Sequence, residues 1–288
     1  MKYILTGASG KYGAIVLKYL KNQGVERDTI AVIRNEKNAD TIQELGFEVR
    51  IADYSHENAL AKAFSGGERL LFISSLPGGE ISRLKHHENV IKAAKGAGIT
   101  FIAYTSFPKA DQSKSIVAPD HAVTERMIIE SGINYAFLRN NWYLENELPI
   151  FDKANSTGIF AYSAGEGRVG WALRREYAEA GARILLGIDK STGILELSGR
   201  PLSYSDLASC YAKISDKTIE EKAFDDETYK EFLAKAGDPE EIIAGTLAIQ
   251  NDIRNGGLDI EQSDFERILG KPLTPLLDAV NEMLNKKS

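Results

Sequence analysis

Short apolar runs and longer segments of helical periodicity alternate through the first 140 residues of the chain. Strands that alternate with helices and are apolar on both faces form a parallel sheet covered on each side by helices. The sequence therefore predicts a doubly wound α/β domain. The predicted strands are 3–5, 29–33, 48–51, 69–74, 101–104 and 135–138, and the predicted helices are 12–20, 39–45, 58–64, 86–97 and 123–131.

The second half of the chain is less regular, and we expect it to form a smaller, mostly helical lobe on the substrate side. The sequence thus divides into a domain over 1–150 and a lobe over 151–288, and about 175–200 is expected to pack back on the sheet. The acidic stretch over 224–227 is expected to be a solvated loop. Predicted strands are 158–162 and 194–198, and predicted helices are 175–186, 227–236, 239–254 and 276–284.

Charge and cysteine content exclude several classes of protein. The net charge of −6 and the lack of a basic run argue against nucleic-acid binding. The single cysteine, Cys210, excludes an intrachain disulfide framework, and no apolar run is long enough to span a bilayer. Neither a P-loop nor a nucleophile-elbow motif occurs, and the adjacent His86 and His87 lack the spacing of a metal site. We expect a cytoplasmic protein without a metal.

Three glycines lie where the first predicted strand turns into the first predicted helix, in the run TGASGKYG. The spacing Gly7-x-x-Gly10-x-x-Gly13 lets the backbone turn tightly and approach a ligand. The helix that follows presents free amides and a partial positive charge to an anion. A pyrophosphate fits such a turn, whereas the alternative is a tight turn that holds no ligand.

The end of the second predicted strand carries a cation where NAD-binding sites usually place an acidic residue. In the run AVIRN, Arg34 offers a forked, permanently charged donor set that suits a 2′-phosphate, and Asn35 can add a hydrogen bond. This favours NADP(H) as the cofactor. The alternative is an exposed loop arginine without a ligand.

Several separate motifs together resemble the NmrA-like branch of the atypical short-chain dehydrogenases, and within it the group of bacterial type 2 NAD(P)H:quinone oxidoreductases. The resemblance covers nearly the whole chain and implies a Rossmann-like domain that binds NADP(H). The motifs are TGASGKYG, VIRN, ADY at 52–54, FISS at 72–75, FIAYTS at 101–106 and LRNNWYLEN at 138–146.

The resemblance also implies roles for individual residues. The glycine turn holds the pyrophosphate, Arg34 meets the 2′-phosphate, and Asp53 lies near the adenine. Trp142 and Tyr143 lie beside the nicotinamide, where the acceptor stacks. The sequence itself further suggests Phe107 as part of the same apolar slot and Trp171 as a wall of the acceptor pocket. The remaining residues assigned to the cofactor by the resemblance are Ala8, Ser9, Lys11, Tyr12, Ser74, Ser75, Leu76, Thr105, Ser106 and Asn141.

Structural explanations for the same residues stay open. The hydroxyl residues and Asp53 can cap helices or turns, because such side chains commonly satisfy backbone groups where loops begin. Trp142 and Tyr143 can be packing residues at the junction of sheet and lobe.

The acid–base pair of ordinary short-chain dehydrogenases, Tyr-x-x-x-Lys, is missing from this chain. If Glu125 is aligned with the glutamate that often follows that lysine, then His121 takes the lysine position and Val117 the tyrosine position. His121 is our candidate proton donor because its reference pKa of about 6.5 lies near neutrality, and Tyr143 is a second catalytic candidate. The alternative for His121 is a surface or capping residue.

Two functions from different classes fit these observations. One is an NADPH-dependent reductase of quinones or similarly planar, electron-poor compounds, which need less acid catalysis than an unactivated ketone because the reduced product is less basic. The other is an NADP(H)-binding redox sensor without turnover. The sequence leaves open whether the protein forms a homodimer.

Overall fold

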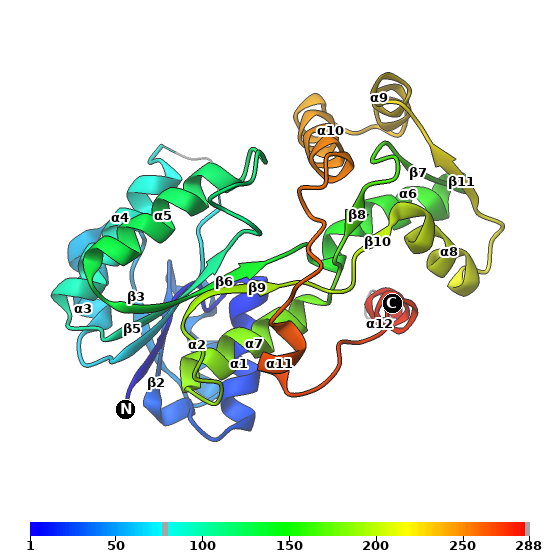
Figure 1. Ribbon diagram of the computed structural model, residues 1–288. Helices are drawn as coiled ribbons and strands as arrows, with labels where there is room; N and C mark the ends of the chain where they lie inside the picture. Colours follow the sequence, from blue (N-terminus) through cyan, green and yellow to red (C-terminus); the bar gives the residue numbers. More distant parts are fainter. Residues whose placement is uncertain (77–79, 286–288) are drawn as a thin grey trace.

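A computed structural model gives the structure of this chain, and it describes residues 1–76 and 80–285. Its main sheet has seven strands, all paired in parallel, in the order β3-β2-β1-β4-β5-β6-β9 (Figure 1). The order reverses between β1 and β4, which is where doubly wound sheets open a crevice for ligands. The strands are β1 (Tyr3–Leu5), β2 (Thr29–Ile33), β3 (Glu48–Ile51), β4 (Arg69–Phe72), β5 (Phe101–Ser106), β6 (Asn134–Asn140) and β9 (Gly193–Leu197).

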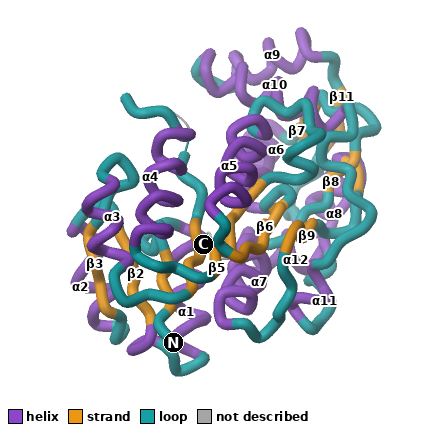
Figure 2. Tube along the Cα trace, turned by 60° about the vertical axis from the view of Figure 1, so that its left-hand side comes forward, coloured by secondary structure: helices purple, strands orange, loops and turns teal. Residues whose placement is uncertain are grey.

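Helices cover both faces of this sheet, which confirms the predicted doubly wound α/β fold. The face with α3, α4 and α5 buries one apolar cluster, and the face with α1, α2, α7 and α11 buries another (Figure 2). The bounds are α1 (Lys11–Asn22), α2 (Ala39–Glu44), α3 (Glu57–Phe64), α4 (Arg83–Gly96), α5 (Ala118–Ser131), α7 (Arg174–Leu186) and α11 (Phe265–Leu269), with 3₁₀ turns η1 (Glu26–Asp28) and η2 (Glu36–Asn38).

The smaller lobe lies beside the carboxyl end of the sheet and is mostly helical (Figure 1). Its core is a third apolar cluster that includes Phe151, Phe160 and Tyr211. Its elements are η3 (Leu144–Glu147), α6 (Leu148–Thr157), β7 (Ile159–Tyr162), β8 (Arg168–Val169), β10 (Leu202–Ser203), α8 (Tyr204–Ile214), β11 (Glu220–Ala223), α9 (Asp226–Lys235), α10 (Glu240–Arg254) and α12 (Leu276–Asn285).

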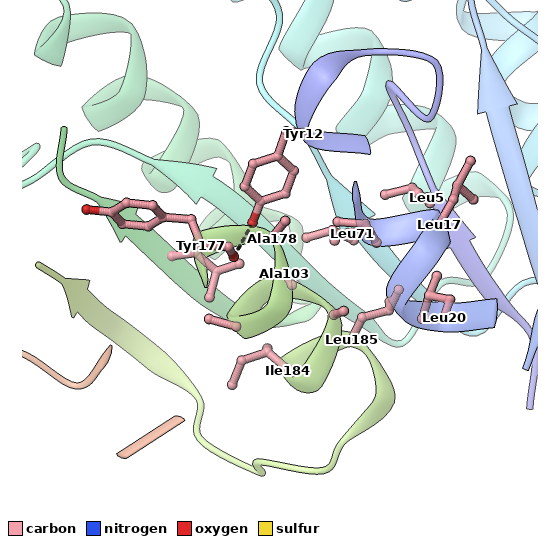
Figure 3. Close-up of a cluster of buried hydrophobic side chains, with 14 of the residues drawn as sticks. Leu5, Tyr12, Leu17, Leu20, Leu71, Ala103, Tyr177, Ala178, Ile184 and Leu185 are labelled. Atoms are coloured by element: carbon pink, nitrogen blue, oxygen red, sulfur yellow. Dashed lines mark hydrogen bonds between the residues drawn. The ribbon is translucent and has the colours of Figure 1, made fainter. Parts of the chain in front are cut away.

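The chain passes more than once between the sheet domain and the lobe. After β8 it returns to form α7 against α1 and then β9 beside β6, and later α11 packs on α7. Figure 3 shows one consequence at the amino ends of α1 and α7, where the Tyr12 hydroxyl donates a hydrogen bond to the Tyr177 carbonyl oxygen at 2.7 Å. Residues distant in sequence therefore share one core.

Some elements begin and end elsewhere than the sequence predicts. α4 and α5 begin several residues earlier, at Arg83 and Ala118, and Pro119 lies in the first turn of α5, where proline costs no hydrogen bond. The acidic stretch over 224–227 is a solvated loop only in part. Asp225 and Glu227 are exposed, but Asp225 caps α9, which begins at Asp226, and Asp226 pairs with Arg254 at 2.6 Å. The favourable effect of acidic side chains at a helix N-terminus explains this difference.

Candidate functional site

The glycine turn between β1 and α1 has the close packing that only glycine permits. Gly7 has a φ of +61°, and a Cβ at Gly13 would lie 2.2 Å from the Gly7 carbonyl oxygen and 2.7 Å from the Ala8 Cα. Because both obstacles are backbone atoms, neither can move aside as a side chain would. The turn therefore depends on glycine for its shape.

The amino end of α1 has the features of an anion-binding site. No side chain caps this end, and the first turn contains no acidic residue. The first amides of a helix have no partner within the helix, and they carry a partial positive charge. Ser9, Gly10 and Lys11 are exposed beside them, whereas Ala8 is buried. These residues fit a bound pyrophosphate.

The Tyr12 side chain turns away from this amino end and into the core. Its hydroxyl binds the Tyr177 carbonyl oxygen, and its ring lies 6.3 Å from the ring of Tyr143. Burial raises the pKa of Tyr12 well above its usual value. The Tyr12 side chain thus joins α1 to α7, and only its backbone amide lies in the glycine turn.

Arg34 and Asp53 follow the two neighbouring strands β2 and β3. Arg34 is exposed. The Asp53 carboxylate accepts a hydrogen bond from the Ser55 amide at 2.7 Å, so Asp53 does cap a turn, which was the alternative to a role at the cofactor. Burial opposes ionisation of Asp53, but the Ser55 hydrogen bonds and the charges of His86 and Arg34 lower its pKa. The positive charge of the exposed Arg34 thus acts on an ionised carboxylate at this edge without forming an ion pair with it among the described contacts.

The loops after β4 and β5 are joined to each other and to α4. The Ser74 amide donates to the Thr105 hydroxyl at 2.9 Å, and the Ser75 amide donates to His87 Nε2 at 3.0 Å. Leu76 follows with 86% of its surface exposed. The structure therefore holds Ser74, Ser75 and Thr105 together at the carboxyl edge.

Three of the four residues assigned to the acceptor side lie in one apolar cluster. Phe107 and Trp171 are buried in the core of the lobe, and Trp142 packs against the same core. Tyr143 packs instead against the cluster on the α1–α7 face, with its ring 5.0 Å from that of Tyr177. Adjacent residues thus point into two different cores, and Tyr143 is separated from the other three.

Two adjacent asparagines at the end of β6 present unpaired oxygens. Asn141 donates through Nδ2 to the Ser198 hydroxyl at 2.9 Å and the Leu258 carbonyl at 3.0 Å, and Asn140 donates to the Tyr143 hydroxyl at 3.0 Å. Both Oδ1 atoms are buried and have no partner among the described residues. A buried unpaired acceptor is costly, so these oxygens are candidates for a hydrogen-bond donor on a ligand.

Glu147 organises the aromatic residues of the lobe, and the sequence analysis missed it. Its Oε1 accepts hydrogen bonds from Trp171 Nε1 at 3.0 Å and from the Tyr204 hydroxyl at 2.9 Å, and Trp142 also interacts with the carboxyl group. Burial raises the pKa of Glu147 to about 7, although these hydrogen bonds oppose the rise. A single glutamate after an aromatic pair carries no sequence signal for this role.

His121 is buried in a chain of hydrogen bonds rather than exposed at a helix start. Arg83 Nη2 lies 3.0 Å from its Nε2, and the Tyr104 hydroxyl lies 2.9 Å from its Nδ1. Arginine can only donate, so Nε2 accepts and the ring proton is on Nδ1. Burial first, and then the positive charge of Arg83, lower the pKa of His121 well below 6.5. Phe107 stacks on this imidazole with centroids 6.0 Å apart.

His87 is buried in the same way, next to His121. Because its Nε2 accepts from the Ser75 amide, its proton is on Nδ1 and is donated to the Thr124 hydroxyl at 2.7 Å. Burial, followed by the charges of Arg83 and His86, lowers the pKa of His87 to about 3. The spacing of His86 and His87 had excluded them as a metal site. The structure makes it a neutral support for the loop after β4.

Ser106 belongs to an ion network around the buried Arg139–Glu125 pair, which the sequence did not predict. Its hydroxyl donates to Glu125 at 2.6 Å, and Glu125 in turn pairs with Arg139. Arg139 also reaches Glu196 at 3.1 Å and Asp111 at 2.8 Å. These side chains come from separate segments of the chain, so no local sequence motif predicts the network.

Two cavities lie near the junction of the domain and the lobe. One of about 540 Å³ lies between α1, α7 and α12, and none of the sequence-predicted site residues lines it. The other, of about 250 Å³, is lined by Trp171 together with Arg200 and Leu202. Within residues 1–76 and 80–285, no group of three or more potential metal ligands occurs, and no helix has the length and apolarity to cross a membrane.

Comparisons with known proteins agree with this geometry. The model of the NmrA-like family matches residues 2–267. The chain is 36% identical over 284 residues to quinone oxidoreductase 2 of Escherichia coli (strain K12), covering 98% of each protein. It also resembles the crystal structure of the E. coli NADPH-dependent quinone oxidoreductase QOR2 complexed with NADPH, with a TM-score of 0.91, 34% identity and coverage of 98% of this chain and 99% of the other.

A dye reductase of known structure is similarly related. The triphenylmethane reductase of Citrobacter sp., crystallised with NADP(H), matches with a TM-score of 0.91 and 32% identity, covering 98% of this chain and 100% of the other. The relatives thus include a quinone oxidoreductase and a triphenylmethane reductase.

Proposed function

The chain belongs to the NmrA-like family, and from this premise we propose that it is an NADPH-dependent oxidoreductase that transfers a hydride to quinones or similarly planar, electron-poor acceptors. The single observation that carries the proposal is the glycine turn, whose uncapped helix end follows β1 at the reversal of strand order. Doubly wound sheets bind dinucleotides at this position.

NADPH, when bound, supplies the hydride. The amides of the glycine turn, from Gly7 to Gly13, are proposed to hold its pyrophosphate, and Arg34 is proposed to pair with the 2′-phosphate through its forked donors. Asp53 is assigned to the adenine end, and the loops after β4 and β5 line the rest of the cofactor. The unpaired amide oxygens of Asn140 and Asn141 are acceptors suited to the carboxamide group of a nicotinamide.

The residues of the chain act on the acceptor mainly by holding it. Phe107, Trp142 and Trp171 are proposed to form the apolar wall against which a planar ring lies. Positioning an electrophile next to a hydride donor supplies much of the rate, and a quinone needs little acid help because its reduced anion is weakly basic. This fits a chain with Val117 and His121 at the positions of the missing Tyr-x-x-x-Lys pair.

Proton donation at this edge has two candidate groups. Tyr143 has its pKa raised to about 12, chiefly by burial, so its phenol keeps its proton at neutral pH. His121 is neutral and carries its proton on Nδ1, toward Tyr104. A direct role for either group in the reaction remains part of this proposal.

The test is an assay of NADPH oxidation by the purified protein with a panel of small quinones, after subtraction of the uncatalysed rate. A parallel titration measures binding of NADPH and NADH. We expect turnover that saturates in both NADPH and quinone. Tight NADPH binding with no turnover above background across the panel contradicts the reductase and favours a redox sensor.

The cellular setting is proposed on composition. A single cysteine provides no disulfide within the chain, which is typical of a cytoplasmic protein. A homodimer remains a prediction, and light scattering on the purified protein tests it.

A further inference from the structure

Arg83 is a buried cation without a carboxylate partner. It is the first residue of α4 and is only 8% exposed. No carboxylate of the described residues lies within ion-pair distance, and its Nε is buried without a hydrogen-bond partner. A buried guanidinium is costly unless an anion or a set of acceptors compensates it, so this position needs an explanation.

The one hydrogen bond described for the Arg83 side chain goes to His121. Arg83 Nη2 donates a hydrogen bond to His121 Nε2 at 3.0 Å, and the imidazole donates one through Nδ1 to the Tyr104 hydroxyl at 2.9 Å. Of these hydrogen-bonded side chains, only Arg83 is charged near neutral pH. His121 and His87 have lowered pKa values, and Tyr104 has a raised one. Asp120 influences Arg83 through space but does not reach ion-pair distance. The positive charge at this point is therefore held by Arg83 and is independent of pH in the neutral range.

Arg83 lies at the carboxyl edge of the sheet. α4 follows β4 and α5 follows β5, so both helices begin at this edge, and they lie side by side in both overall views (Figures 1 and 2). His121 is in the first turn of α5, and Phe107 stacks on its imidazole. The guanidinium is thus one side chain away from a residue of the proposed acceptor wall.

The loops that lead into the two helices carry exposed apolar side chains. Leu76, before α4, is 86% exposed, and Ile116, before α5, is 72% exposed. These are the two most exposed large hydrophobic residues in the part of the chain that the structure describes. Exposed apolar side chains on the loops before α4 and α5, together with a buried guanidinium on the first residue of α4, suit a ligand that is itself flat, apolar and negatively charged.

We propose that Arg83 is a specificity-determining residue that selects planar acceptors bearing an anionic oxygen group, such as a sulfonate or carboxylate on a quinone ring. The inference rests on the proposed reductase function. In the reaction, hydride transfer from NADPH to the quinone gives NADP⁺ and the hydroquinone monoanion, which takes one proton from solvent. Arg83 contacts the anionic substituent and is not consumed or changed.

The binding test uses two probes of matched shape and different charge. Calorimetry in the presence of NADP⁺ compares 2-naphthalenesulfonate with the neutral 2-naphthalenesulfonamide, and needs no turnover. The wild-type protein is expected to bind the sulfonate more tightly than the sulfonamide. In Arg83→Gln the ratio of the two dissociation constants is expected to fall by about tenfold or more, as the loss of one charge-assisted hydrogen bond predicts. Arg83→Lys should keep part of it because the charge remains.

The matched control is Arg126→Gln, which removes an exposed arginine from α5. It should leave the preference unchanged. The thermal melt and the NADPH dissociation constant of each variant are measured alongside. An equal loss for both probes in Arg83→Gln, or a loss confined to NADPH binding, overturns the assignment. If Arg83→Gln does not fold, the absence of a sulfonate preference in the wild type overturns it equally.

A turnover test separates this inference from the proposed function. The rates with 1,2-naphthoquinone and with its 4-sulfonate are compared in the wild type and in Arg83→Gln. We expect kcat/KM to fall about tenfold more for the sulfonate than for the neutral quinone. If both quinones are reduced without a charge preference, the reductase function is supported and the role of Arg83 is contradicted. If neither quinone is reduced, the reductase function itself is contradicted.

Discussion

The Arg139 guanidinium forms a two-point ion pair with the Glu125 carboxylate, with Nε to Oε1 at 2.9 Å and Nη2 to Oε2 at 2.7 Å. Both side chains are almost fully buried, at 4% and 5% exposed. The pair joins β6 to α5, and Ser106 adds a hydrogen bond from the end of β5. It thereby fixes the strand end from which Phe107 and the following loop depart.

Removing one member of this pair should destabilise the protein strongly. Arg139→Met leaves Glu125 buried without its cation, and breaking a buried pair in this way costs about 3–5 kcal/mol. Urea denaturation of the variant measures this cost. The control is Lys92→Met, which breaks an exposed pair with Glu88 and should leave the midpoint unchanged. Similar midpoints for both variants would contradict the stabilising role of the Arg139 pair.

Gly13→Ala should disrupt the turn between β1 and α1. The new methyl group would lie against the Gly7 carbonyl oxygen, so the turn must open and NADPH binding should weaken by about tenfold or more. The matched control is Gly245→Ala on α10, where a Cβ meets nothing within 4 Å. That variant should bind NADPH as the wild type does. Calorimetric titration compares them, and unaltered binding by Gly13→Ala would remove the proposed pyrophosphate site.

Arg34→Ala should weaken NADPH far more than NADH. The guanidinium is proposed to contact only the 2′-phosphate, and a hydrogen bond between charged groups contributes about 1.5–3 kcal/mol, or roughly tenfold to a hundredfold in affinity. Arg27 provides the control, because it is exposed at the opposite end of β2. Dissociation constants for both cofactors decide the matter. Equal losses for NADPH and NADH contradict the phosphate assignment.

Ionisation of His121 should not appear in the pH profile near neutrality. Burial and the charge of Arg83 lower its pKa well below 6.5, and Arg83, Tyr104 and His87 surround it. Lowering the pH from 8 to 6 therefore leaves the imidazole neutral. We expect kcat/KM for His121→Asn to be lower than for the wild type, with a profile of the same shape. A wild-type inflection near pH 6.5 that this variant abolishes would instead support proton donation by His121.

Glu147 should make the protein less stable as the pH rises. Its pKa is raised from 4.5 in the unfolded chain to about 7 in the folded one, so the folded state binds the proton more tightly. The resulting stabilisation is complete below about pH 4.5 and is lost as the pH passes through about 7. The difference corresponds to roughly 3 kcal/mol.

Glu147→Gln tests this pH dependence because the amide cannot ionise. Urea midpoints of the wild type and the variant are measured at pH 5 and pH 8. The variant is expected to gain stability relative to the wild type between these two values. Glu130→Gln, at an exposed position on α5, is the control and should track the wild type. A constant difference between Glu147→Gln and the wild type would contradict the raised pKa.

Much of the fold could be predicted from the chain alone. The six early strands and the helices between them follow from hydrophobic periodicity, and the glycine turn follows from its place between the first strand and the first helix. Helix starts were less accurate, as at Arg83 and Ala118, because side-chain caps and proline determine where a helix begins and these signals are short.

The site was predictable only in part. Phe107, Trp142 and Trp171 do share one cluster, but Tyr143 packs into another core although it is adjacent to Trp142. No local pattern could show that Glu147 accepts from Trp171 and Tyr204, or that Arg139 pairs with Glu125. Such contacts join residues far apart in sequence.

The sequence by itself determined the alternation of elements, the parallel sheet and the glycine turn, because periodicity and the steric freedom of glycine act over a few neighbouring residues. Only the tertiary structure decided the charge states at the carboxyl edge. His121 is neutral because burial removes water from it and Arg83 occupies its Nε2, and Arg83 is unpaired because no carboxylate of the described residues is folded against it. Burial and charge pairing depend on which distant segments meet, and a linear pattern does not contain that information.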